Sequence, residues 1–137
     1  MSQPLDLTPL AKALRRLAEG LVRYQSDTGD TQIRDGLIQR FEFTYEISHK
    51  MLKRFLESAA ANPAAIDAMA FAELIRTGNE QGLLLGGWTD WKRYREMRSR
   101  TSHAYDEAMA QSVVAGIPAF LAEAQFLLKQ LAGRSAE

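Results

Sequence analysis

The sequence contains no cysteine, which excludes disulfides, thiolate metal sites and thiol nucleophiles. It also lacks an excess of charge of either sign, because 17 basic and 17 acidic residues cancel. A neutral chain has no overall field to draw it onto nucleic acid or an anionic membrane, so an anionic partner must be held locally. With only two histidines among 137 residues, we expect no metal site and no cofactor.

Targeting signals and long apolar runs are missing as well. The first residues lack the basic start and the apolar core of a signal peptide. No apolar stretch approaches the roughly 18 residues of a membrane span. These absences predict a cytoplasmic chain with no membrane partner. The length is that of one ordinary domain, residues 1–137.

No segment alternates apolar and polar residues as a strand does, whereas helical spacing recurs along the chain. Apolar residues three and four apart from Leu7 to Tyr24 predict a first helix, capped by Thr8 with Pro9 in its first turn. Residues 31–60 contain no proline and have a wide apolar surface. That pattern predicts a central helix with neighbours on two sides.

The second half predicts three further helices. Pro63 opens a shorter helix that ends near Gly78, and residues 82–87 form an irregular connection. Another helix carries four apolar residues spaced by three, Trp88, Trp91, Tyr94 and Met97. A last helix starts near Asp106.

Gly116 and Pro118 are expected to kink or break that last helix. The whole pattern predicts an all-α fold, an up-and-down antiparallel four-helix bundle with an extra short helix.

One stretch carries residues suited to phosphate chemistry. Residues 98–106 read Arg-Ser-Arg-Thr-Ser-His-Ala-Tyr-Asp. Arg98 provides a permanent charge with forked donors, His103 a proton carrier near neutral pH, and Tyr105 a phenol. On one straight helix Arg98 and His103 lie about 140° apart. Their spacing therefore implies a bend between them, or two copies meeting across a dimer.

The same region holds the one local basic cluster of this neutral chain. Its members are Lys92, Arg93, Arg95 and Arg100. Two interpretations stay open for them: a solvated helix face, or a track that binds RNA or a nucleotide.

The remaining polar candidates have simpler interpretations. His49 lies in the middle of the central helix, where we expect it to pack or to face solvent. Glu42 and Glu46 are expected to be surface charges, with Glu46 paired to Lys50 one turn later. Asp106 is expected to cap the last helix.

Two stretches resemble a known family. Residues 36–46, Gly-Leu-Ile-Gln-Arg-Phe-Glu-Phe-Thr-Tyr-Glu, resemble the second-helix signature of nucleotidyltransferase substrate-binding proteins. Residues 98–106 resemble the arginine–histidine–tyrosine motif of the wider HEPN superfamily. The resemblance runs from about Leu10 to Leu131. It implies a helical bundle that forms a homodimer and binds a minimal nucleotidyltransferase encoded beside it.

The resemblance implies two functions. In the first, the chain is a metal-independent endoribonuclease toxin and the nucleotidyltransferase is its antitoxin. Arg98 and His103 then match the catalytic positions, and Tyr105 matches the tyrosine that the partner modifies with adenylyl groups. In the second, the chain is a non-catalytic subunit that binds a substrate or nucleotide. The chain departs from the pattern at Ser99, where many relatives have asparagine, so a structural dimer module is a third interpretation.

RNA cleavage without a metal requires a proton carrier and positive charge near the phosphate. Histidine, with a reference pKa of about 6.5, suits general acid–base catalysis at neutral pH. An arginine can donate paired hydrogen bonds to phosphate oxygens. The 2′-hydroxyl would be the nucleophile, so RNA rather than DNA is the expected substrate.

Overall fold

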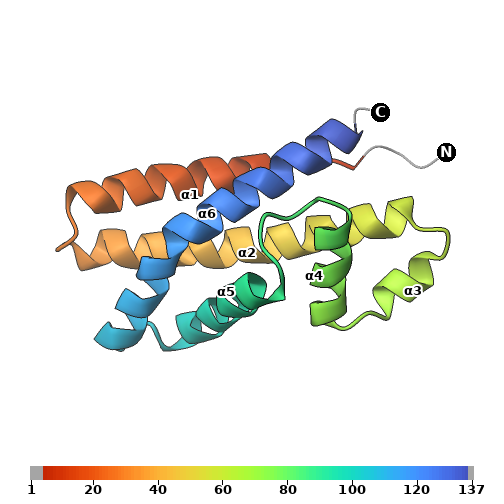
Figure 1. The fold of residues 1–137 in the computed structure, drawn as a ribbon. Coiled ribbons are helices and arrows are strands. Elements are labelled where there is room, and N and C mark those ends of the chain that lie inside the picture. The colour runs from red at the N-terminus through yellow and green to blue at the C-terminus, as the bar shows by residue number, and fades with distance from the viewer. Residues whose placement is uncertain (1–4, 136–137) are drawn as a thin grey trace.

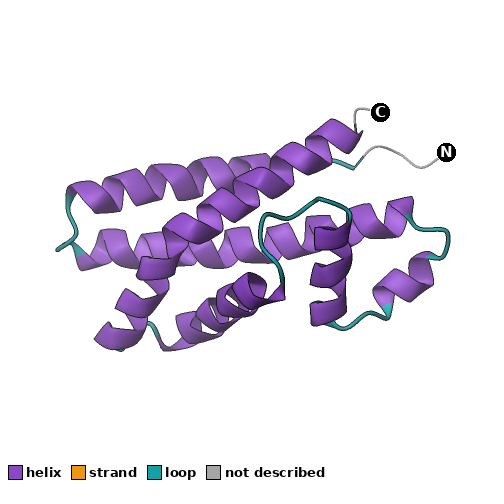
Figure 2. Ribbon diagram, in the orientation of Figure 1, coloured by secondary structure: helices purple, strands orange, loops and turns teal. Residues whose placement is uncertain are grey.

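The computed structural model describes residues 5–135, and all its regular elements in that range are helices (Figure 2). The first four residues, which entered the signal-peptide prediction, lie outside the described part. The elements are α1 (Thr8–Ser26), α2 (Thr31–Ala59), α3 (Pro63–Asp67), α4 (Phe71–Glu80), α5 (Trp88–Arg100), the 3₁₀ turn η1 (Thr101–His103) and α6 (Glu107–Ser135). The predicted all-α class is confirmed.

The long helix α2 is the centre of the fold, as its wide apolar surface predicted. It contacts all the other helices and η1. Figure 1 shows α1 lying along one half of α2, α6 crossing the pair, and the short helices α3 and α4 beside the far half of α2. Asp30 starts α2, because its carboxylate accepts hydrogen bonds from the backbone N–H groups of Gln32 and Ile33.

A cluster of buried aromatic rings joins α2, α5 and α6. Phe120 of α6 lies at its centre, with its ring centroid 5.0 Å from Phe41 and 5.3 Å from Tyr94. Tyr45 and Trp91 complete the cluster at 6.2 and 6.3 Å from Phe120. Edge-to-face contacts of this kind add to the stabilisation from apolar burial. The cluster sets the position of α5, which carries all four residues of the predicted basic cluster.

Gly116 and Pro118 were predicted to kink or break α6, and no break occurs, because the helix continues through Pro118. Buried residues on both sides of the proline, Ile117 and Phe120, keep the helix packed on the core. Figure 1 shows only a change of direction between its first turns and the rest. Gly116 instead allows close packing, since a Cβ there would lie 2.5 Å from the sulfur of Met97 in α5.

Helix α6 is also apolar enough to be compared with a membrane-spanning segment. By length and composition, Glu107–Arg134 resembles a membrane span, with a mean hydropathy of 1.3. This corrects the sequence-based statement that no stretch approaches one. One face of the helix is nevertheless buried against the other helices. The fully buried residues on it include Val113, Ile117, Phe120, Ala124, Leu127 and Leu131. In this structure α6 is therefore one of the core helices of the bundle, beside α2.

Two details of the helix boundaries differ from the predictions. Thr8 is not the cap of α1 but its first residue, and the carboxylate of Asp6 accepts the Thr8 N–H. The single short helix predicted from Pro63 is divided into α3 and α4. Between them Ala70 has an extended backbone with ψ 155°. This turn lets Leu74 and Ile75 reach the core, and tertiary packing overrides the alanine-rich helical pattern.

Glu123 of α6 holds the connection between α4 and α5 in place. Its carboxylate oxygens accept hydrogen bonds from the backbone N–H groups of Leu85 and Gly86, both at 2.7 Å. Only 2% of Glu123 is exposed. The connection leads directly into α5, so this buried carboxylate fixes where that helix begins.

Replacing Glu123 with alanine should lower the free energy of unfolding by about 2 kcal/mol, because two backbone donors lose their acceptor. Urea denaturation at pH 7 measures this change. Glu19→Ala, at an exposed position of α1, is the control and should change stability by less than about 0.5 kcal/mol. Equal stabilities for the two variants would contradict this role of Glu123.

Glu123 should also make stability depend on pH. Burial raises its pKa above the ordinary value of 4.5, although the hydrogen bonds from Leu85 and Gly86 lower it in part. The folded protein therefore binds a proton more readily than the unfolded chain. The resulting stabilisation is complete below pH 4.5 and is lost as the pH rises through the folded pKa.

In urea titrations from pH 4 to pH 7, the stability of the wild type relative to the non-titrating Glu123→Gln variant should fall steadily. If the stability of the wild type relative to Glu123→Gln rises over this range instead, folding lowers the pKa of Glu123 rather than raising it.

Candidate functional site

The arginine–histidine–tyrosine motif lies at the bend between α5 and α6. Helix α5 ends at Arg100, η1 turns the chain over Thr101–His103, and α6 begins at Glu107. The chain thus changes from α-helix to a 3₁₀ turn between Arg98 and His103, and it turns into α6 after His103. Asp106 caps α6 as predicted, since its carboxylate accepts the N–H of Met109 at 3.0 Å.

A partly buried ion pair fixes the start of α6 just after the motif. Arg34 of α2 is only 6% exposed and donates to the carboxylate of Glu107 at 2.7 Å. It also contacts Asp35 at 3.2 Å. The hydrogen bond from Arg34 lowers the pKa of Glu107, so this carboxylate stays ionised at neutral pH. The bend is thus tied to the central helix at its α6 end.

Arg98 ties the other end of the bend to the same helix. Its Nε and Nη2 both donate to one oxygen of Glu46, at 3.1 and 2.5 Å. Its Nη1 donates to the hydroxyl of Thr101 at 3.0 Å and lies 3.3 Å from a carboxylate oxygen of Glu42. Both glutamates are at least partly exposed, as expected of surface charges. The predicted pairing of Glu46 with Lys50 is wrong, because Glu46 pairs with Arg98 of α5 instead.

These contacts orient Arg98 without using all its donors. A guanidinium has five N–H groups, one on Nε and two on each terminal nitrogen. Three form hydrogen bonds with Glu46 and Thr101, which leaves one N–H on each terminal nitrogen; Nη1, which carries one of these, also lies 3.3 Å from a carboxylate oxygen of Glu42. The Arg98 side chain is 28% exposed. It can therefore donate to a phosphate while Glu46 holds it in place.

His103 and Tyr105 lie next to each other on the surface. Their ring centroids are 6.2 Å apart in an edge-to-face arrangement. Tyr105 is 88% exposed, so a large partner can reach its hydroxyl. Within residues 5–134, the hydrogen bonds and ion pairs of Arg98 do not include His103. Their convergence on one phosphate stays a prediction.

The predicted basic cluster divides between two sides of α5. Helical geometry puts Arg93 about 160° from Arg95 but only about 20° from Arg100. Arg93 lies 3.7 Å from Asp90 and over the ring of Tyr94. Arg95 lies over the ring of Phe71, on the side of Arg98. Lys92 is exposed one turn before Arg95. The four residues therefore do not form one continuous track.

A small hollow of about 300 Å³ lies beside Arg98, where α2, α4 and α5 meet. Its lining residues are Tyr45, His49, Phe71, Arg95, Arg98 and Ser99. His49 is half-buried rather than a surface residue, and its ring meets Phe71 edge to face at 4.8 Å. Burial lowers the pKa of His49, and the charges of Lys53 and Arg95 lower it further.

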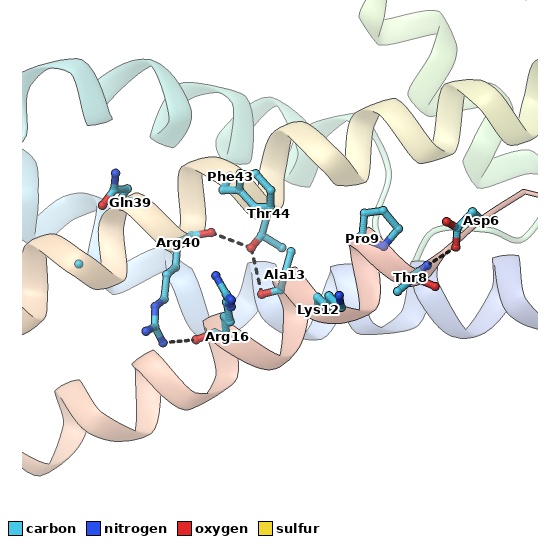
Figure 3. Close-up of a pocket in the computed structure, with 11 residues that line it drawn as sticks. Asp6, Thr8, Pro9, Lys12, Ala13, Arg16, Gln39, Arg40, Phe43 and Thr44 are labelled. Atoms are coloured by element: carbon cyan, nitrogen blue, oxygen red, sulfur yellow. Dashed lines mark hydrogen bonds between the residues drawn. The ribbon is translucent and has the colours of Figure 1, made fainter.

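A larger hollow of about 860 Å³ lies between α1 and α2 (Figure 3). The basic residues Lys12, Arg16 and Arg40 line it together with Phe43, which is 59% exposed. The Arg40 guanidinium donates to the backbone carbonyl of Arg16 at 2.7 Å. Side chains of the signature at residues 36–46 therefore lie on two sides of α2. Arg40 and Phe43 line this hollow, and Glu42 and Glu46 contact Arg98. Within residues 5–134, no group of three histidine or acidic side chains is placed to hold a metal ion.

Comparison with known proteins gives a consistent family assignment. Residues 5–133 match the family described as "Nucleotidyltransferase substrate binding protein like". The probable ribonuclease HepT of Haemophilus influenzae is 38% identical over 143 residues, covering 98% of this chain and 97% of that protein.

Solved structures give the same result. A Haemophilus influenzae structure, described as the fold of a substrate-binding domain of a nucleotidyltransferase, matches with a TM-score of 0.86 and 38% identity. The match covers 93% of this chain and 99% of that chain. A Thermus thermophilus crystal structure matches with a TM-score of 0.66 and 27% identity, over 93% of this chain and 99% of that one. The chain therefore belongs to the nucleotidyltransferase substrate-binding protein family and is homologous to the probable ribonuclease HepT.

Proposed function

We propose that this chain, as a single domain over residues 1–137, is the HEPN subunit of a cytoplasmic two-component toxin–antitoxin pair with a minimal nucleotidyltransferase. Its activity in this proposal is metal-independent RNA cleavage, with Arg98 and His103 as the catalytic residues. One observation carries the proposal: Arg98 is aligned by Glu46 at a bend that also exposes His103 and Tyr105. A relative described as a probable ribonuclease, similar over 97% of its length, supports it.

In the proposed reaction the 2′-hydroxyl of the RNA forms a bond to phosphorus and the bond to the 5′-oxygen breaks. The products are a 2′,3′-cyclic phosphate and a free 5′-hydroxyl. One His103 takes the proton of the 2′-hydroxyl, and the leaving 5′-oxygen takes a proton from the second His103 of the dimer or from water. The two remaining N–H groups of Arg98 donate to the phosphate oxygens as negative charge develops.

The charges around Arg98 set a condition for this reaction. Glu42 and Glu46 place two negative charges against one guanidinium, so these three groups alone would repel RNA. The cations Lys92 and Arg95, on the same side of α5 as Arg98, offset the carboxylates. RNA binding in this proposal therefore uses that side of α5, and salt should weaken it.

A homodimer completes the site in this proposal. Each subunit exposes a His103, and within residues 5–134 the hydrogen bonds and ion pairs of Arg98 do not reach that histidine. Two motifs facing each other across a two-fold axis would form one cleft with two arginines and two histidines. The cleft would then hold a scissile phosphate between groups from different subunits.

Tyr105 is the proposed point of regulation. The nucleotidyltransferase would transfer an adenylyl group from ATP to the Tyr105 hydroxyl, forming a bond to the α-phosphorus and releasing pyrophosphate. The exposure of the hydroxyl makes this transfer sterically feasible. The attached phosphate would lie beside His103, where it would block RNA and neutralise positive charge.

A second function, a non-catalytic subunit that binds a substrate or nucleotide, is favoured by a different observation. Arg98 is already engaged by two glutamates of its own chain. Such an arginine could serve mainly to hold α5 against α2. The hollow lined by His49 and Arg95 would then be the functional feature of the surface.

Cleavage of single-stranded RNA in EDTA tests the proposal. His103→Ala should reduce the rate at least about 100-fold, as expected for loss of a general acid–base group. Because His103 is exposed, the melting temperature should stay the same, and circular dichroism provides that control. Retention of the wild-type rate by His103→Ala would rule out the mechanism. If the wild type does not cut RNA but binds nucleotides only with its partner, the binding function is correct.

A further inference from the structure

The hollow between α1 and α2 has no part in the proposed function (Figure 3). Its lining within residues 5–134 comes from α1, α2 and Asp6, while α6 packs on both helices without contributing to it. The hollow has a volume of about 860 Å³ and combines exposed cations with an apolar lining. We infer that it is a docking surface for another protein, which binds through a helix with one apolar face flanked by acidic residues. The inference concerns protein binding and does not require that the chain cleave RNA.

Apolar and small residues line the hollow on both helices. Pro9 and Ala13 lie one turn apart on α1, and Gly36 and Phe43 lie two turns apart on α2. Phe43 is 59% exposed, and a Cβ at Gly36 would meet nothing within 4 Å, so both positions leave room above α2. The lining extends about 12 Å along each helix, because eight residue steps separate its ends. That length suits about two turns of a third helix laid in the groove between the pair.

Three cations line the same hollow, Lys12, Arg16 and Arg40. Within residues 5–134, none of them lies within ion-pair distance of a carboxylate. The lining also includes the carboxylate of Asp6, which accepts the Thr8 N–H. The hollow therefore carries an excess of positive charge that its own chain does not neutralise. Acidic side chains beside the apolar face of a partner helix would complement this charge.

Arg40 is already held in position across the groove. Its Nη1 donates to the backbone carbonyl of Arg16 at 2.7 Å. A Cβ at Gly20 would lie only 3.2 Å from the Cδ of Arg40, so glycine there lets this side chain cross close to α1. The hydrogen bond uses one of the five N–H groups of the guanidinium, and the others can donate to a partner carboxylate. An arginine that is already fixed loses less side-chain entropy when a partner binds.

Charge and shape distinguish this occupant from two others. A second copy that faced the first across a two-fold axis would place cations against cations, which disfavours a homodimer through this surface. An RNA strand would neutralise the cations, but its phosphates would leave the apolar surfaces of Ala13 and Phe43 uncovered. The motif lies on another side of α2, where Glu46 contacts Arg98. A helix docked in the groove would therefore leave the motif open.

Fluorescence anisotropy with synthetic peptides and the full chain tests the inference. The probe is a labelled peptide of about 18 residues, long enough to form a helix, with leucines three and four apart and glutamates beside them. Two comparison peptides have the same length, one with lysine in place of every glutamate and one with serine in place of every leucine. The acidic leucine peptide should bind at least about tenfold more tightly than either, because docking uses both the charge and the apolar face.

Three results of this comparison would overturn the inference. The first is no measurable binding of the acidic leucine peptide. The second is equal binding of the lysine or the serine peptide, since the surface would then not select the proposed chemistry. The third is displacement of the acidic peptide by a single-stranded RNA of the same charge at a similar concentration, which would identify a nucleic-acid surface instead.

Two matched pairs of variants locate the surface on the chain. Arg16→Glu should raise the dissociation constant of the acidic leucine peptide about tenfold or more, whereas Arg15→Glu, the same change just outside the hollow, should raise it less than about threefold. Phe43→Ser should also weaken binding about tenfold or more, whereas Val22→Ser, at a residue 67% exposed on α1, should change it less than about twofold. Because all four positions are exposed, circular dichroism should show unchanged helix content. Equal weakening within either pair would contradict the placement of the docking surface in this hollow.

Discussion

The two-point pairing of Arg98 with Glu46 is the interaction on which the rest of the site depends. It joins residues 52 positions apart and holds the last turn of α5 against the middle of α2. The Glu46 side chain is 60% exposed, so the pair contributes no more than about 1 kcal/mol to stability. Its importance is geometric, because one carboxylate oxygen bound to Nε and Nη2 fixes the plane of the guanidinium.

The core makes this pairing possible. Phe120 packs against rings of α2 and α5 and sets the distance between those helices. Glu123, one turn later in α6, fixes the start of α5 through Leu85 and Gly86. At the other end Arg34 fixes the start of α6 through Glu107. The motif therefore lies on a bend held from three sides, while His103 and Tyr105 face solvent.

Much of the fold could be predicted from the sequence because its signals are local. The spacing of Trp91, Tyr94 and Met97 defined the buried side of α5, and the proline-free pattern of residues 31–60 predicted α2 closely. The division between α3 and α4 was missed, since an alanine-rich segment does not determine its own turn. Gly116 and Pro118 were predicted to kink or break α6. The helix stays continuous, because core contacts on both sides of Pro118 outweigh the lost hydrogen bond, and it changes direction after its first turns.

The candidate site was less predictable because the residues that contact one another in it are far apart in the chain. Arg98, His103 and Tyr105 were recognised from their motif. The bend, or a dimer in its place, was predicted because Arg98 and His103 would point in different directions on one straight helix. Glu46 was assigned to Lys50 because sequence spacing reveals only neighbours on the same helix. Its presence in the signature at residues 36–46 was the one available signal of another role. The hollow around His49 depends on where Phe71 of α4 packs, which no local pattern contains.

A double-mutant cycle on RNA cleavage tests most directly whether Glu46 acts through Arg98. Cleavage rates in EDTA are compared for the wild type, Glu46→Gln, Arg98→Lys and the double variant. We expect Glu46→Gln to slow the wild type about tenfold or more, because the guanidinium loses its alignment. The same change should have little further effect in the Arg98→Lys variant, since a lysine ammonium cannot pair at two points. Independent losses that multiply in the double variant would contradict the account.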